Sequence, residues 1–402
     1  AKHITFIVTK DCQLACKYCY LVGKNVKERM SFEIAKKAID YILDHKEDFS
    51  ERSVVWDFIG GEPFIEVGLI DSICDYLKKE MYRRNHHWFN SYRFSFSTNG
   101  INYHTKKVQD FIKKNQEHIC VGITIDGTQK KHDLNRIWKT PEMEHGIRPK
   151  PEEERGSYVD VVKNIPLWLK QFPGGATKVT ISSADIPYIQ ESVLHLYSLG
   201  IHEVNINCVF EDVWKEGDDI LFEEQLLQLA DAIIDGDYYK DYACSFFSEN
   251  IGKPLDRELE SQNWGGAGRM LSIDAAGDFY PCTRFAQDSL RSKKPIIIGN
   301  VKDGIDKNKL RPFLTLDRCT QSRPECVDCE VASGCAWCQG ENYDAADTPT
   351  INQRAIAICK MQKARVRANN YYWNKLYRKL ELEGIAKEEA KKHVKGSNTK
   401  NC

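Results

Sequence analysis

The hydrophobic pattern of the first half of the chain alternates between two periods. Between the strand-like runs, apolar residues recur near the 3.6-residue period of a helix, as in Phe32–Leu43 and Leu69–Met81. Six strand-then-helix units in succession predict parallel strands joined by helical crossovers. A closed barrel of this kind has eight units, so we expect an α/β fold with a partial (β/α)6 barrel, open on one side. The strand-like runs are His3–Thr9, Val54–Ile59, Tyr92–Ser97, Cys120–Ile125, Lys178–Ser182 and Glu203–Phe210.

The pattern changes after Phe210. A helix is predicted over Phe222–Ile234 and another over Asn352–Leu382, with a cysteine- and turn-rich segment at residues 264–359 between them. The residues after Leu382 are charged and predict a frayed tail. The domains that we expect are a barrel at 1–210, a bridging region at 211–263, a cysteine-rich domain at 264–380 and the tail at 381–402.

Composition narrows the class of protein. The chain has 402 residues and a formal net charge of −1, which gives no support to a nucleic-acid-binding role. No apolar run is long enough to span a membrane, and the first strand begins at once, so we expect no signal peptide and a cytoplasmic location. In a reducing compartment, clusters among the 15 cysteines predict metal ligands rather than disulfides. Cys74, Cys120 and Cys208 lie in apolar patterns and are expected in the core, whereas Cys244 and Cys402 have no assignment.

Polar motifs follow the first four predicted strands. They are Asp11–Tyr20, Gly60–Pro63, Ser97–Gly100 and Asp126–Gly127, in chain order. Parallel α/β barrels place their active site at the carboxyl ends of the strands. We therefore expect these motifs to meet there.

The first motif holds three cysteines, Cys12, Cys16 and Cys19, spaced C-x3-C-x2-C. Thiolates are the natural ligands of iron–sulfur clusters, and three of them leave one iron of a cubane free for a small molecule. A zinc site is the alternative that this motif alone leaves open.

In this order and spacing, the motifs resemble those of the radical S-adenosylmethionine superfamily. The resemblance implies that Gly60, Gly61, Glu62 and Pro63 meet the amino group of the cofactor, and that Ser97, Thr98 and Asn99 contact its ribose or carboxylate. It also implies a cofactor contact by the aromatic Tyr18, and by Asp126 and Arg136 of a DG…HDxxR stretch, in which the arginine pairs with the carboxylate. No residue is assigned as a catalytic acid or base.

The C-terminal third resembles the SPASM domain of peptide- and protein-modifying members. Gly277 and Cys282 form G-x4-C, and C-x2-C-x5-C-x2-C follows. The resemblance implies two auxiliary [4Fe–4S] clusters, three in all. One would be held by Cys326, Cys329, Cys335 and Cys359; Cys282 and Cys338 would contribute to the other, with Cys319 as a substitute for a family cysteine that is absent before Gly277.

Counting Cys282, Cys319 and Cys338 gives three thiolates, one short of four. An open iron there would bind a substrate thiolate, so we expect a maturase that forms thioether cross-links in a ribosomally made precursor peptide. The hypothesis of formylglycine formation is less favoured, because Thr283 occupies the position at which sulfatase-maturing relatives carry an acidic base. It stays an alternative, together with carbon–carbon cross-linking and, from another class, a non-catalytic zinc scaffold.

The expected partners follow from this resemblance. They are the peptide, a low-potential electron donor such as ferredoxin or flavodoxin, and a separate leader-binding protein, because the barrel begins at residue 3 without an extra recognition module. The charged segment Gly127–Gly156 is either a lid or peptide-docking loop, or a solvated insertion.

Overall fold

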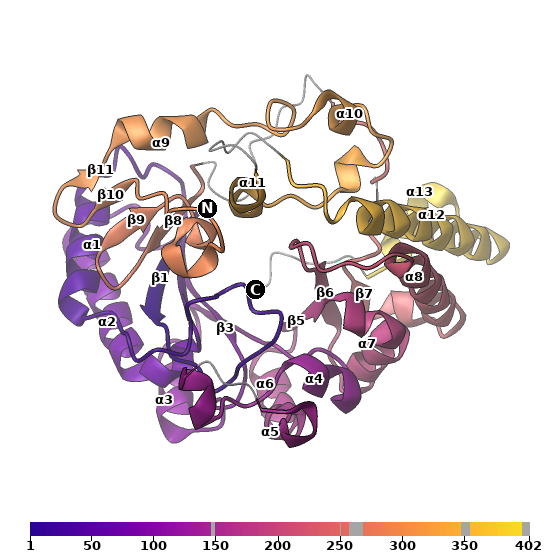
Figure 1. Cartoon of the computed structure of the whole chain (residues 1–402), viewed down its shortest axis with the longest axis horizontal. Helices are drawn as coiled ribbons and strands as arrows, with labels where there is room; N and C mark the ends of the chain where they lie inside the picture. Colours follow the sequence, from indigo (N-terminus) through magenta and orange to yellow (C-terminus); the bar gives the residue numbers. More distant parts are fainter. Residues whose placement is uncertain (146–148, 250, 257–267, 347–353, 396–402) are drawn as a thin grey trace.

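The structure, a computed structural model, describes residues 1–145, 149–249, 251–256, 268–346 and 354–395. Six parallel strands form the barrel wall, with helices on their outer side (Figure 1). Strands β1 to β4 are hydrogen-bonded in order, β5 pairs with β6, and a parallel bridge between Thr124 and Lys178 links β4 to β5. The predicted partial barrel is confirmed. The six strands are β1 (Lys2–Thr9), β2 (Val54–Gly60), β3 (Tyr92–Thr98), β4 (Ile119–Ile123), β5 (Ala176–Ile181) and β6 (Glu203–Cys208).

The two outer helices that the sequence pattern predicts are present, and each extends one or two residues beyond the predicted bounds except at Phe32. The hydroxyl of Ser31 caps α1 by accepting a hydrogen bond from the Ile34 N–H, and Ala35, Ile39 and Ile42 form its buried face. The helices of the barrel are α1 (Phe32–Asp44), α2 (Val67–Arg83), α3 (Lys106–Lys114), α4 (Gln129–Asn135), α5 (Tyr158–Val162), α6 (Ile165–Gln171), α7 (Ile189–Ser198) and α8 (Asp218–Asp235).

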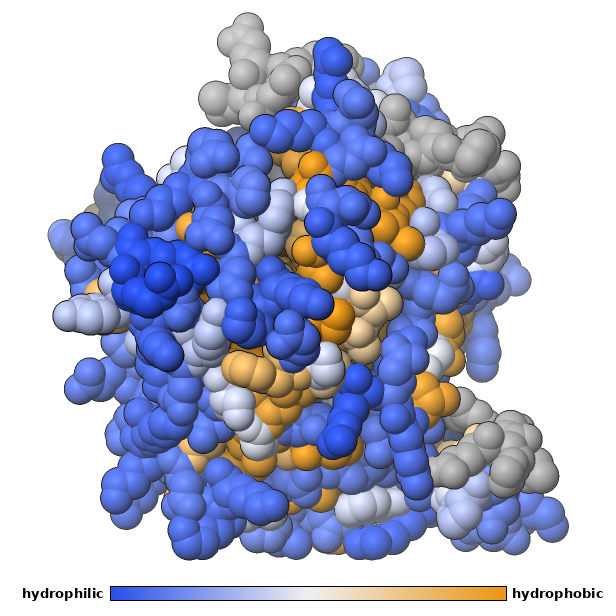
Figure 2. Space-filling view, turned by 90° about the vertical axis from the view of Figure 1, so that its left-hand side faces the viewer, coloured by the Kyte–Doolittle hydropathy of each residue, from blue (hydrophilic) through white to orange (hydrophobic). Residues whose placement is uncertain are grey.

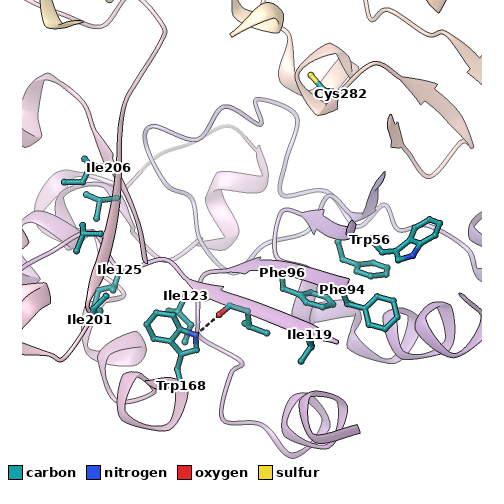
Figure 3. Packing of buried hydrophobic residues seen from close by; sticks show 14 of the residues in the cluster. Trp56, Phe94, Phe96, Ile119, Ile123, Ile125, Trp168, Ile201, Ile206 and Cys282 are labelled. Carbon is teal, nitrogen blue, oxygen red and sulfur yellow. Dashed lines mark hydrogen bonds between the residues drawn. The ribbon is translucent and has the colours of Figure 1, made fainter. Parts of the chain in front are cut away.

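Alternate residues of the strands have opposite character. On the outer face, Phe58 stacks on Phe6 and on Phe96, with ring centroids 5.7 and 5.2 Å apart, in the core beneath the helices. Figure 3 shows Phe96 with other residues of this core, and the indole N–H of Trp168, which donates to the Val121 carbonyl at 2.7 Å. The inner face is polar, because Thr5, Asp57 and Ser95 lie in register on β1, β2 and β3.

The barrel sheet continues beyond β1 into the cysteine-rich region. Strand β8 (Met270–Ile273) pairs with β1 in parallel, and an antiparallel run of three short strands extends from it, as Figure 1 shows. Strands from residues 270–305 therefore share one sheet with the barrel. The predicted boundary at residue 264 lies outside the described residues and stays a prediction. The run consists of β9 (Asp278–Tyr280), β10 (Gly299–Asn300) and β11 (Gly304–Ile305).

Several features of the C-terminal half differ from the sequence expectations. A seventh parallel strand, β7 (Ala243–Cys244), pairs with β6 and places the unassigned Cys244 in the core. The long C-terminal helix α12 begins at Cys359 rather than at Asn352, since the Ala355 N–H donates to the Asn342 side chain instead of continuing a helix; residues 352 and 353 lie outside the described part. The remaining helices are α9 (Lys307–Leu314), α10 (Pro324–Val327), α11 (Gln339–Ala345), α12 (Cys359–Leu382) and α13 (Lys387–Ala390).

The prediction of a frayed tail is wrong for its described part. Ala390 is buried, Ile385 and Val394 pack against the core, and the Lys395 N–H donates to the Tyr239 carbonyl at 2.8 Å. Apolar residues spaced along a charged segment are enough to dock it on α12.

The surface is mainly polar. Figure 2 shows hydrophilic residues with apolar ones between them on the face that carries α1 and β11. Among the described residues, no helix combines the length and the hydropathy that a membrane span requires.

Candidate functional site

The cysteine loop follows β1 and is partly enclosed. Cys12 is buried, and burial raises the pKa of its thiol to about 12. Its sulfur accepts a hydrogen bond from the Leu14 N–H at 3.4 Å, while Cys16 and Cys19 are less buried. The side chain of Lys24 reaches the same place: burial lowers its pKa, but Cys16, Cys19 and Cys12 outweigh this and raise it. Three thiols and one ammonium group thus share this loop.

The glycines after β2 allow a close backbone approach to the cysteine loop. A Cβ atom at Gly61 would lie 2.9 Å from the Cys12 Cβ and closer still to the Asp11 carbonyl oxygen. The N–H groups of Gly61 and Glu62 donate to the carbonyls of Thr9 and Asp11 at 3.0 and 2.9 Å. The pair of glycines therefore fixes this turn directly against the first cysteine.

The carboxylate of Glu62 is buried and already has protein donors. It accepts hydrogen bonds from the Thr98 hydroxyl at 2.7 Å, the Asn99 N–H at 2.7 Å and the Phe64 N–H at 3.0 Å. Burial raises the pKa of Glu62, although these hydrogen bonds act to lower it. Pro63 opens the short 3-10 turn Pro63–Glu66. Glu62 thus joins the ends of β2 and β3, and the Thr98 hydroxyl is committed to it.

Asn99 connects β3 to the cysteine loop. Its amide nitrogen donates to the Gln13 side chain at 3.1 Å and lies 3.9 Å from the Cys12 sulfur. Ser97 differs from its neighbours, since its side chain is exposed on the inner face of the barrel. The predicted residues of β3 therefore divide into two that brace the site and one that faces the barrel interior.

Tyr18, Asp126 and Arg136 form a buried polar cluster. The Tyr18 phenol donates a short hydrogen bond to Asp126, and the Arg136 guanidinium donates to the phenol oxygen at 3.1 Å. Burial would raise the pKa of Asp126, but Lys131 and Arg136 keep it below its usual value. The Nε of Arg136 is buried and has no hydrogen-bond partner among the described residues. An anionic group fits this unused donor.

The DG…HDxxR stretch is built around His132. Burial lowers the pKa of its imidazole to about 3, so the ring is neutral. Its Nδ1 accepts the Asp126 N–H at 3.2 Å, and its Nε2 therefore donates to the Ser157 hydroxyl at 3.0 Å. The Ser157 hydroxyl in turn donates to the Arg136 carbonyl at 2.7 Å. The histidine thus sets the backbone that carries Asp126 and Arg136.

The segment Gly127–Gly156 packs on the cysteine loop, apart from residues 146–148, which are not described. The Ala15 N–H donates to the Ile137 carbonyl at 2.8 Å, and the Lys139 ammonium lies 2.9 Å from the Asp11 carboxylate. A second ion pair joins Lys17 to Glu154 at 2.6 Å. These contacts favour a clamp on the cysteine loop over a solvated insertion.

The C-terminal cysteines fall into two neighbourhoods. Burial raises the pKa of Cys335, and Cys359 and Cys326 add to this shift while Arg354 opposes it. Burial raises the pKa of Cys282 to about 12, with Cys338 as the next cause. Cys329 precedes the turn Ala332–Gly334, and Cys319 accepts the Ser322 N–H at 3.2 Å through its carbonyl. Cys335 therefore lies near Cys326 and Cys359, and Cys282 lies near Cys338, while the division of all these cysteines, with Cys319 and Cys329, into two ligand groups stays a prediction.

Arg284 joins the two cysteine regions. Its guanidinium lies 5.1 Å from the centre of the Tyr20 ring, next to Cys19, and donates to Glu211 at 2.9 Å and Glu341 at 2.7 Å. The Cys338 thiol and these carboxylates raise the pKa of Arg284, although burial opposes them. One arginine thus contacts the first loop, the segment after β6 and α11.

The donor set of the first loop fits an iron–sulfur cluster. Within the ranges that the structure covers, no group of three or more His, Cys, Asp or Glu side chains converges on one metal position. Iron–sulfur clusters are held by cysteine thiolates at separate irons, so their ligands do not have to meet at one metal position. Three thiols in one loop, beside an unused arginine donor, fit a cluster and an anionic cofactor.

The comparisons with known proteins agree with this arrangement. Residues 3–142 match the family described as a 4Fe-4S single cluster domain. An uncharacterized protein of Methanocaldococcus jannaschii is 27% identical over 77% of this chain and 91% of its own. The serine-type anaerobic sulfatase-maturating enzyme of Bacteroides thetaiotaomicron is 23% identical over 68% of this chain and 67% of its own.

Solved structures share the fold over most of the chain. The structure of anSMEcpe with bound AdoMet has a TM-score of 0.66 and 17% identity, covering 92% of this chain and 99% of that one. Streptococcus suis SuiB bound to the precursor peptide SuiA has a TM-score of 0.54 and 14% identity, covering 89% of this chain and 75% of that one. The resemblance to the radical S-adenosylmethionine proteins with a SPASM-type region is confirmed.

Within this fold, the sequence patterns did not indicate two charged residues of the site. Lys24 lies in an irregular loop, where no period indicates which side chains turn inward. Arg284 pairs with Glu211 and Glu341, which are 73 and 57 positions away in the sequence. A local sequence pattern does not contain such contacts.

Proposed function

We propose that this protein is a radical S-adenosylmethionine maturase that forms thioether cross-links in a cysteine-containing precursor peptide. The observation that carries the proposal is the proximity of the Cys282 and Cys338 thiols. Cys319 would join them as a third thiolate, so a fourth position would be left for a substrate sulfur. Relatives that act on or bind polypeptides support the substrate class.

The first site would hold one [4Fe–4S] cluster on Cys12, Cys16 and Cys19. When bound, the cluster and S-adenosylmethionine supply a strong hydrogen-atom abstractor. The protein would orient the cofactor carboxylate with Arg136, which Tyr18 and Asp126 hold in place. Two auxiliary clusters on the C-terminal cysteines would bring the total to three.

The residues also explain the preference among reactions. Thioether formation removes two hydrogens from the peptide, one as an atom and one as a proton, with one electron passed on to an acceptor. Thr283, which follows Cys282, offers a hydroxyl rather than a carboxylate. A base for formylglycine formation is therefore missing at that position, although a sulfatase-maturating enzyme is among the relatives.

Mass spectrometry of reacted peptides tests the proposal. The protein, reconstituted anaerobically, is incubated with S-adenosylmethionine, dithionite and candidate cysteine-containing peptides, and the products are treated with iodoacetamide. A peptide that has lost two hydrogens and resists alkylation indicates a thioether. Loss of two hydrogens with a reactive thiol indicates a carbon–carbon bond, and loss of the sulfur indicates formylglycine.

A Cys16→Ala variant is the control for the first cluster. It is expected to release no 5′-deoxyadenosine. Release at the wild-type rate would refute the assignment of the first site, and zinc in place of iron would favour the scaffold alternative.

A further inference from the structure

One carboxylate of the barrel has no part in the site described above. Asp57 lies on the inner face of β2, because its neighbours Trp56 and Phe58 are buried in the core on the outer face. It precedes Gly60 by three residues, so its backbone lies about 10 Å along the strand from the turn beside the first cysteine. The Asp57 side chain therefore belongs to the barrel interior, beneath the cysteine loop.

The sheet neighbours of Asp57 carry hydroxyl groups. Thr5 on β1 and Ser95 on β3 are its register partners, and Ser272 on β8 is the register partner of Thr5. Ser272 is buried, and its hydroxyl has no hydrogen-bond partner among the described residues. A buried hydroxyl of this kind is a position for an ordered water molecule. Asp57 thus stands in a row of polar side chains that crosses four adjacent strands.

A lysine on another strand acts on Asp57 through its charge. Val179 of β5 is buried in the core, so Lys178 points the other way, into the barrel, where it is exposed. Burial raises the pKa of the Asp57 carboxyl, while Ser95 and Lys178 act to lower it. Within the described part of the chain, no basic side chain forms an ion pair with Asp57 within 4.0 Å. A positive charge therefore influences this carboxylate without being bonded to it.

The carboxylates around the site already have protein partners. Each of them accepts hydrogen bonds from the protein, and two share the Arg284 guanidinium. A partner that stabilises the ionised form makes a carboxylate a poorer proton acceptor. Among the described residues, Asp57 is therefore better placed than these groups to take up a proton. The partnered carboxylates are Asp11, Glu62, Asp126, Glu211 and Glu341.

Tyr20 places Asp57 near both cysteine regions. Burial raises the pKa of the Tyr20 phenol to about 12, and the nearby Cys19 and Asp57 add to this shift. The Tyr20 ring centre also lies 5.1 Å from the guanidinium of Arg284, which follows Cys282 by two residues. Asp57 thus lies within electrostatic reach of a side chain that stands between the first cysteine loop and the segment after Cys282.

We propose that the Asp57 carboxylate accepts the proton of the peptide cysteine during thioether formation. This inference rests on the proposed function, in which the substrate sulfur binds iron, because a thiol must lose its proton before it can ligate a metal. The sulfur–hydrogen bond breaks, the proton passes to an Asp57 oxygen, and the electron pair stays on sulfur. The second hydrogen leaves a peptide carbon as an atom, to the hydrogen-atom abstractor. The carbon–sulfur bond then forms, and one electron passes to an oxidised iron–sulfur cluster.

Three variants test the inference. Asp57→Asn removes the proton acceptor and keeps the size of the side chain, whereas Asp57→Glu keeps a carboxyl group. Glu203→Gln is the control, because it makes the same chemical change at a buried carboxylate at the first residue of β6, at the amino end of the barrel. Each reconstituted protein is incubated with S-adenosylmethionine, dithionite and a cysteine-containing peptide that wild type cross-links. Iron content, 5′-deoxyadenosine and thioether product are measured between pH 7 and pH 9, and binding of the labelled peptide is measured separately by fluorescence anisotropy.

Thioether formation by Asp57→Asn is expected to fall about 100-fold or more at pH 7, the usual range for loss of a general base. Its iron content and peptide affinity should match wild type, and 5′-deoxyadenosine should still form, because hydrogen-atom abstraction does not use the proton acceptor. Its thioether rate should rise about 10-fold from pH 7 to pH 8, since the free thiol, with a pKa of about 8.5, then ionises by itself. Asp57→Glu should recover part of the rate, and Glu203→Gln should resemble wild type.

A wild-type thioether rate in Asp57→Asn at pH 7 would overturn the inference and leave the proposed function standing. An equal loss of 5′-deoxyadenosine and thioether, weaker peptide binding or a lower iron content would assign Asp57 a structural or positioning role, and would overturn the inference as well. If wild type forms no thioether with any cysteine-containing peptide, the proposed function fails, and the inference fails with it.

Discussion

The carboxylate of Glu62 accepts a 2.7 Å hydrogen bond from the Thr98 hydroxyl. Both groups are buried, and the contact joins the carboxyl ends of β2 and β3 beneath the first cysteine. The geometry of the turn that holds Gly60 and Gly61 therefore depends on β3 as well as on β2.

Replacing Thr98 by Val should destabilise the protein. The change removes a donor to Glu62 and leaves a buried carboxylate oxygen with one hydrogen bond fewer, which costs about 1–3 kcal/mol. Urea unfolding of the cluster-free protein, followed by circular dichroism, measures the loss. Ser97→Ala, on the exposed side of the same strand, should change stability by less than about 0.5 kcal/mol. Equal stability of the two variants would contradict the bracing role.

Replacing Arg136 by Lys should weaken S-adenosylmethionine binding. A lysine keeps the charge but loses the planar set of donors, and a hydrogen bond to a charged group contributes about 1.5–3 kcal/mol. That range corresponds to roughly 10- to 100-fold in affinity, to be measured by equilibrium dialysis on the reconstituted protein. Arg311→Lys, exposed on α9, serves as the control. Wild-type affinity in Arg136→Lys would remove Arg136 from the cofactor site.

Asp57 gives a pH-dependent prediction. Burial raises its pKa, against the influence of Ser95 and Lys178, so the folded protein favours the protonated carboxyl. The contribution of Asp57 to stability is fully present below a pH of about 3.9, which is the pKa of this carboxyl in the unfolded chain. It is lost as the pH rises through the higher pKa of the folded protein. Asp57→Asn should therefore be more stable than wild type at pH 7, and the difference should shrink toward pH 4. Urea midpoints across this range check it, and a difference that grows as pH falls would show the opposite shift.

Replacing Cys359 by Ala should remove an auxiliary cluster. With three [4Fe–4S] clusters, the reconstituted wild type should contain about 12 irons per chain, and the variant about 8. Cys74→Ala is the matched control, since Cys74 is fully buried in the core, away from both cysteine groups. It should lower stability and leave the iron content unchanged. A wild-type iron content near 4 would exclude the auxiliary clusters.

The sequence predicted the barrel and the position of its motifs for a simple physical reason. Strand and helix periods are local, and the carboxyl ends of parallel strands meet at one edge, so Cys12, Glu62, Asn99 and Asp126 had to lie close together. The same reasoning predicted the first residue of α1 correctly and its last residue to within one position, because α1 ends at Asp44 and the prediction ended at Leu43.

Other features depended on contacts that no local pattern contains. The start of α12 at Cys359 follows from the Asn342 side chain, and the pairing of β8 with β1 joins residues more than 260 positions apart. The two-residue strand β7 is too short to show a period. The bracing role of Thr98 was missed because a hydroxyl at a strand end suits a ligand and a carboxylate equally well.

The pairing of β8 with β1 has a mechanical consequence. The strand that leads toward Cys282 is hydrogen-bonded to the strand that leads to Cys12, in the register His3 with Met270 to Phe6 with Ile273. A hinge between the two cysteine regions would have to break this ladder. The distance between the first cysteines and Cys282 is thus set when the sheet folds, and it does not depend on the closing of a hinge.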